Sequence, residues 1–166
     1  MNREKGVDLE NLLVVLTPDA PLQKVEDKIA EWVGEEKKRK RIILLMVVEE
    51  DLPSSVSSWL MYVGFLGGKL ESEMKKAIIE ELMIRGREIL EDQKKKLREL
   101  GVSFILREDF GGVREIIKGA IEEFSPSEVI VTGFEREKLE DLNAVSYTHL
   151  RAHETRHDLV CRLLLE

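Results

Sequence analysis

The segment Ile42–Val48, with the sequence IILLMVV, decides the fold class because its apolar run is uninterrupted. A strand buried on both faces has such a run, whereas a strand with one solvated face alternates apolar and polar residues. The same pattern occurs upstream in Asn11–Leu16 (NLLVVL) and downstream in Val102–Leu106 and Glu128–Thr132 (EVIVT). We therefore expect four strands in one sheet, of which the first two are buried on both faces.

Helical stretches separate these strands. Apolar residues recur at helical spacing from Leu22 to Val33, along Leu70–Leu100 and along Gly112–Phe124. Strand–helix alternation implies parallel strands joined by right-handed crossovers. The predicted fold class is α/β, an open doubly wound parallel sheet with helices on both faces. The predicted inner face of the long helix is Met74, Ala77, Ile78, Leu82, Ile89, Leu90, Leu97 and Leu100.

The composition of the chain argues against some kinds of binding partner. The chain of 166 residues carries a net charge of -7, and an acidic balance argues against a nucleic-acid binder, which needs a basic surface. No apolar stretch is long enough to span a bilayer, so no membrane partner is expected. The one cysteine excludes a disulfide framework, and a cytoplasmic protein is expected.

Two stretches resemble the universal stress protein family. They are residues 44–67 (LLMVVEEDLPSSVSSWLMYVGFLG) and residues 112–133 (GVREIIKGAIEEFSPSEVIVTG), and the likeness extends over Asn11–Arg136. The resemblance implies a strand order of 3-2-1-4-5 and a homodimer formed through the fifth strand. Because the matching sequence stops before that strand, we expect strand 5 to be missing and Glu128–Thr132 to form an open edge.

The resemblance also implies where a nucleotide would bind. Nucleotide-binding members carry an aspartate directly after strand one and G-x-x-G-x(9)-G-[ST] after strand four. Here Gly133 matches the first glycine, Arg136 stands at the second, and Asp19 fits the aspartate only with a shifted register. We therefore predict no cofactor and no strong ATP binding. The alternative is an ATP- or AMP-binding site; its residues, at the strand ends, would be Thr17, Asp19, Val48, Gly111 and Gly133.

Each of these residues also has a simpler interpretation. Asp19 is favoured as a cap of the next helix, Thr17 as a surface hydroxyl, and Gly111 and Gly133 as ordinary turn residues. The apolar segment Trp59–Leu66, which we interpret as loop-like, is either a short helix over the sheet edge or an exposed surface for self-association or a protein partner.

The last 22 residues, Val145–Glu166, resemble a translated sequencing-library adapter. The adapter codons GTC TCT TAT ACA CAT CTC CGA GCC CAC GAG encode Val145–Glu154, and GAT CTC GTA TGC CGT CTT CTG CTT encode Asp158–Leu165. Such scars are excluded from fold reasoning. We therefore predict one domain, residues 1–143, and a non-native tail, residues 144–166. The tail holds His149, His153, His157 and Cys161 at a four-residue spacing that would suit zinc on a helix, but the adapter match leads us to predict no metal site.

Three functional classes remain: a universal-stress-like regulatory or binding module, a nucleotide-dependent member of that family, and a phospho-acceptor receiver. A receiver would use Asp109 as its acceptor, but a lone Asp19 after strand one makes a poor magnesium site. No nucleophile, base and orienting group stand together, so we predict that the protein is not an enzyme. The regulatory module is the function that we favour.

Overall fold

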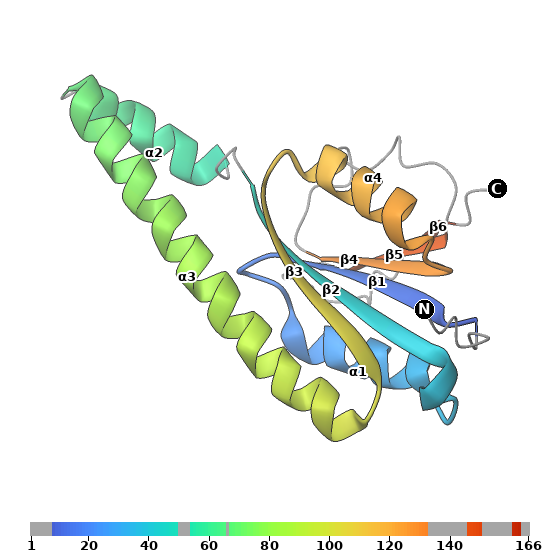
Figure 1. The fold of residues 1–166 in the computed structure, drawn as a ribbon. Coiled ribbons are helices and arrows are strands. Elements are labelled where there is room, and N and C mark those ends of the chain that lie inside the picture. The colour runs from blue at the N-terminus through green and yellow to red at the C-terminus, as the bar shows by residue number, and fades with distance from the viewer. Residues whose placement is uncertain (1–7, 50–53, 66, 133–145, 151–160, 164–166) are drawn as a thin grey trace, which may run out of the picture.

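The computed structural model describes residues 8–49, 54–65, 67–132, 146–150 and 161–163. These residues form a sheet with helices on both faces and a helical arm that projects away from it (Figure 1). In chain order the elements are β1 (Glu10–Leu16), α1 (Leu22–Val33), η1 (Lys37–Arg39), β2 (Lys40–Glu49), α2 (Ser54–Gly64), α3 (Gly68–Leu100), β3 (Ser103–Gly111), α4 (Val113–Phe124), β4 (Glu128–Thr132), β5 (Ser146–Leu150) and β6 (Cys161–Leu163).

The strand order is β3-β2-β1-β4-β5-β6. The strands from β3 to β5 are parallel to their neighbours, and β6 is antiparallel to β5. The predicted α/β class, the parallel pairing and the order 3-2-1-4 are therefore confirmed. The order reverses direction at β1, which has β2 on one side and β4 on the other.

The prediction that strand 5 is missing and that β4 forms an open edge is wrong. β5 lies parallel beside β4 along its whole length, with Glu128 opposite Ser146 and Thr132 opposite Leu150. Strand pairing uses backbone N–H and C=O groups that every residue except proline carries. An open apolar edge therefore accepts an available segment largely irrespective of its sequence. Part of the tail that we excluded from fold reasoning fills this place.

The two faces of the sheet hold separate apolar clusters because successive side chains of a strand point in opposite directions. On one face Leu12, Val14 and Leu16 of β1 pack with α1 and α3. On the other face Leu13 and Val15 pack with α4. β1 and β2 are thus buried on both sides, as their uninterrupted runs predict, whereas the edge strand β3 is only half-buried.

α3 is 33 residues long, but the fully buried positions among its described residues all lie in its second half: Gly86, Leu90, Gln93 and Leu97. Gly86 allows a close crossing over β2, since a Cβ there would lie 3.0 Å from Met46 Cγ. The predicted inner face is correct for Leu90 and Leu97 and wrong for Ala77, which is exposed. The first half of α3 does not lie on the sheet; α2 packs against it instead.

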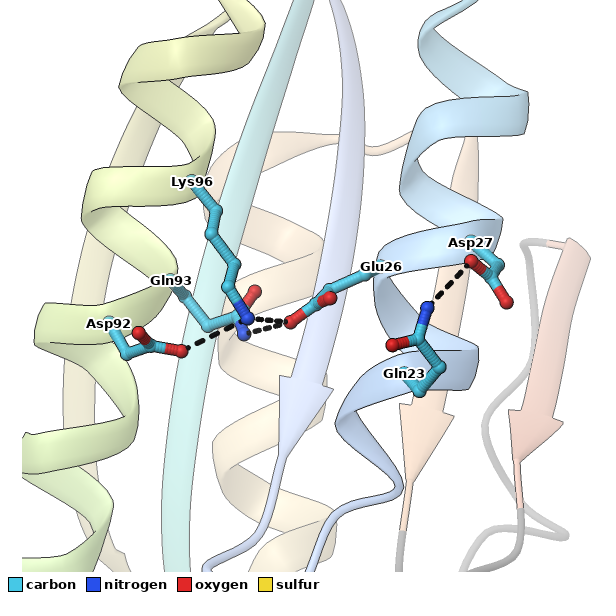
Figure 2. A network of polar contacts seen from close by, with 6 residues as sticks. All are labelled: Gln23, Glu26, Asp27, Asp92, Gln93 and Lys96. Atoms are coloured by element: carbon cyan, nitrogen blue, oxygen red, sulfur yellow. Dashed lines mark hydrogen bonds and ion pairs between the residues drawn. The ribbon is translucent and has the colours of Figure 1, made fainter.

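A polar network joins α3 to α1 (Figure 2). Gln93, which is 1% exposed, donates from Nε2 to Glu26 Oε1 at 2.9 Å. Lys96 Nζ lies 2.5 Å from the same oxygen and 3.2 Å from Asp92 Oδ2. The hydrogen bond to Glu26, followed by that to Asp92, raises the pKa of Lys96 above its ordinary value. The network fixes the second half of α3 over α1 and leaves the first half without comparable support.

Candidate functional site

The candidate site lies at the carboxyl ends of β1, β2 and β4, where the strand order changes direction. Ligands of open α/β sheets bind at such a switch point. Val15 stands opposite Val131, so Thr132 lies beside the last residue of β1 and Thr17 follows directly. The structure therefore places Thr17 and Thr132 close together, at the carboxyl ends of the neighbouring strands β1 and β4. Thr132 is a residue that the sequence analysis did not single out.

The two threonines differ in hydrogen bonding. Thr132 is fully buried, and its Oγ1 donates to the Val15 carbonyl at 2.7 Å. Thr17 is 8% exposed, and its buried Oγ1 has no hydrogen-bond partner among the described residues. The interpretation of Thr17 as a surface hydroxyl is therefore wrong. Because an unsatisfied buried hydroxyl costs free energy, the Thr17 side chain is the polar group here most ready to bond a ligand.

Asp19 does not cap the following helix. The N-cap of α1 is Pro21, which makes no side-chain cap hydrogen bond. Asp19 Oδ1 instead lies 3.2 Å from Arg85 Nη1 of α3, and both side chains are at least half exposed. The predicted cap is wrong, and the carboxylate faces a cation of this chain.

The remaining predicted residues are spread over the sheet end. The Val48 side chain is completely buried, so it offers a ligand only its backbone. Gly111 ends β3, with β2 between it and β1. Its φ of +140° is a conformation that favours glycine, which supports its interpretation as a turn residue. Gly133 and Arg136 lie outside the described residues.

The N-terminus of α4 already has an anion of its own. The carboxylate of Glu115, in the first turn, lies against Gly112, the N-cap residue. A carboxylate at this place interacts favourably with the helix dipole. A phosphate group would have to displace it, so this helix end is poorly suited to bind one.

The sequence raises two other kinds of site, a phospho-acceptor site at Asp109 and a metal site. Asp109 lies within β3 opposite Val47 and not in a loop after the strand, because β3 continues to Gly111. Within the described part of the chain, no three His, Cys, Asp or Glu side chains are grouped so as to hold a metal ion. No helix in the same residues has the length and apolar character needed to cross a bilayer.

Comparison with known proteins identifies the fold. No family model and no curated protein sequence matches the chain. A universal stress family protein from Burkholderia pseudomallei aligns over 82% of this chain and 89% of its own, with 18% identity and a TM-score of 0.53. The fold is that of the universal stress proteins.

Two further solved structures share this universal stress protein fold. A family member from Arabidopsis thaliana, with AMP bound, has a TM-score of 0.54 at 15% identity and aligns over 86% of this chain and 91% of its own. A hypothetical protein that served as a test case for assigning biochemical function from structure has a TM-score of 0.54 at 16% identity, with 89% of this chain and 99% of its own covered.

Proposed function

We propose that this protein is a universal-stress-like regulatory module of the cytoplasm, which acts as a homodimer, binds other molecules without catalysing a reaction, and does not bind ATP strongly. The observation that carries the proposal is the sheet order 3-2-1-4 with its switch point at β1, shared with universal stress protein structures. Outside the adapter-like tail the sequence has no cysteine, which fits a reducing compartment.

Weak nucleotide binding follows from the charges around the switch point. Asp19, the residue nearest to the family's aspartate, is paired with Arg85 and is not free to receive a ribose or a metal-bound phosphate. Glu115 occupies the N-terminus of α4, where a phosphate would otherwise be favoured. In the sequence, Arg136 replaces the family's second glycine and stands between Glu135 and Glu137, which repel a polyphosphate.

A second candidate function is AMP or ATP binding at the same strand ends. Two observations favour it: the Arabidopsis protein of similar fold is solved with AMP, and the buried Thr17 hydroxyl has no partner in the part of the chain that the structure describes. A ligand hydroxyl or phosphate could supply the hydrogen-bond partner that Thr17 Oγ1 lacks. A Thr17→Val variant would then bind nucleotide more weakly than the parent.

Calorimetric titration separates the two candidates. We expect ATP and AMP, each with magnesium, to bind the full chain no tighter than millimolar, and Thr17→Val to leave the weak heat signal unchanged. A micromolar dissociation constant for either nucleotide that weakens at least about tenfold in Thr17→Val would establish the second function and contradict the first.

A further inference from the structure

The helical arm has an apolar side that nothing in the described chain covers. α2 and the first half of α3 form a hairpin that projects from the sheet (Figure 1). Leu60 and Val63 of α2 are 4% and 7% exposed. The hairpin bend is tight, because Gly67 N–H donates to the Gly64 carbonyl at 3.1 Å. The arm is thus a defined helix pair. The expected short helix is confirmed by α2, whereas the loop-like interpretation and the placement over the sheet edge are wrong, because α2 packs against α3.

Exposed apolar side chains lie on α2 and at the start of α3, whereas most other exposed residues in the first half of α3 are charged. Phe65 is 92% exposed, and Tyr62 and Met61 are 75% and 74% exposed. Trp59 and Leu70 are each nearly half exposed. We call these five side chains the hairpin patch. Farther along α3, Ala77 and Ile84 are also exposed, with the exposed Glu73, Glu80 and Glu81 interspersed.

The size of the hairpin patch fits a protein interface. An aromatic side chain presents roughly 150–250 Å². Three largely or partly exposed aromatic side chains, with a methionine and a leucine, therefore present on the order of 600–800 Å². Monomeric proteins rarely expose more than about 600 Å² in one apolar patch, and a standard interface buries about 800 Å² per partner.

The charges of the arm select a second copy of the chain as the occupant. Residues 54–85 carry equal numbers of basic and acidic side chains, namely Lys69, Lys75, Lys76, Arg85, Glu71, Glu73, Glu80 and Glu81. The arm is neutral although the chain has a net charge of -7, so two arms approach without the repulsion that acts between the rest of two copies. A membrane-binding helix would instead have a polar face rich in lysine and arginine.

We propose that two copies dimerise through their hairpin patches. A two-fold axis brings each patch against the same patch of the other copy, as in other self-complementary interfaces. Two helix pairs packed in this way form a four-helix arrangement, which buries the hairpin patch of each copy. The dimer contact lies on the arm and not on the sheet edge. It shares only the dimeric state with the proposed function and does not depend on nucleotide binding.

Sedimentation velocity of the full 166-residue chain tests this contact. We expect the parent to be a dimer and Met61→Glu with Phe65→Glu to be a monomer, with a dissociation constant raised more than tenfold. Both side chains are at least 74% exposed, so the monomer keeps its fold; far-ultraviolet circular dichroism checks its helix content. The milder pair Met61→Ser with Phe65→Ser weakens the dimer in the same direction.

The matched control is Leu9→Glu with Phe110→Glu. These residues are 36% and 49% exposed and lie outside the arm, so the control remains dimeric. Mixing the double glutamate variant with the corresponding double lysine variant of Met61 and Phe65 restores a heterodimer, because opposite charges then face across the two-fold axis.

Several results would overturn the inference. They are a monomeric parent, a dimer unaffected by the changes at Met61 and Phe65, dissociation of the control to the same extent, and a monomer that binds vesicles of neutral phosphatidylcholine. Nucleotide titrations of the same variants report on the proposed function separately, so that either idea can fail alone.

Discussion

The hydrogen bond between Gln93 and Glu26 gives the most quantitative prediction about what fixes α3 on the domain. Gln93 is buried, and Glu26 is its acceptor at 2.9 Å (Figure 2). Glu26→Leu leaves the buried amide without a partner, which costs about 1–3 kcal/mol of the free energy of unfolding. Replacing both residues with leucine removes the unsatisfied group. The loss of the Lys96 contact to Glu26 is common to both chains that carry Glu26→Leu, so it cancels in the cycle. The coupling free energy of the two changes is therefore expected to be on the order of 1–2 kcal/mol.

The assay is a double-mutant cycle from urea unfolding curves with a common m value. Helix α1, which carries Glu26, also supplies a matched control, because its Gln23 Nε2 donates to Asp27 Oδ1 at 3.1 Å on the exposed surface. The corresponding leucine cycle for this pair should give a coupling below about 0.5 kcal/mol. Additive effects at Gln93 and Glu26, or a coupling no larger than that of the control pair, would refute the reasoning.

Three further predictions concern single contacts and the tail. Thr17→Val should raise the melting temperature by removing an unsatisfied hydroxyl, whereas Thr132→Val should lower it by removing a buried hydrogen bond; equal shifts would contradict this. The Arg107 hydrogen bond lowers the pKa of Glu123 below its ordinary value, so the stability that this bond contributes is present above the ordinary pKa and is lost as the pH falls through the lowered one; Glu123→Gln should flatten the acid limb of stability against pH. Truncation after Asn143 should expose the β4 edge and cause aggregation. We propose that resequencing the gene will find different codons beyond Asn143; identical codons would show a native tail.

The strands buried on both faces could be predicted from the sequence, because only that environment favours uninterrupted apolar runs such as Ile42–Val48. β3 could not be bounded, since Arg107–Asp109 are polar residues of a strand whose side chains are only half-buried. A helix at α2 could be offered only as one alternative, because SSVSSWLMYVG has serines and β-branched residues, weak helix formers, and no clear one-sided pattern. Its helix depends on packing against α3, which is a tertiary effect.

The candidate site was predicted in part. The switch-point segments follow from the order of strands and helices, and Thr17 lies there. The hydrogen bonds of the site could not be predicted from the sequence, because Arg85, which pairs with Asp19, is far away in the chain. The partner of Thr132 is a backbone carbonyl on a neighbouring strand, whose register fixes the contact. Long-range partners of this kind leave no local pattern.

The central claim is a regulatory dimer whose assembly does not depend on nucleotide. Sedimentation equilibrium of the full chain, with and without millimolar magnesium ATP, tests it most directly. The account predicts a dimer with the same dissociation constant in both conditions, and a monomer in both for Met61→Glu with Phe65→Glu. A parent chain that is monomeric alone and dimerises only with ATP would contradict it.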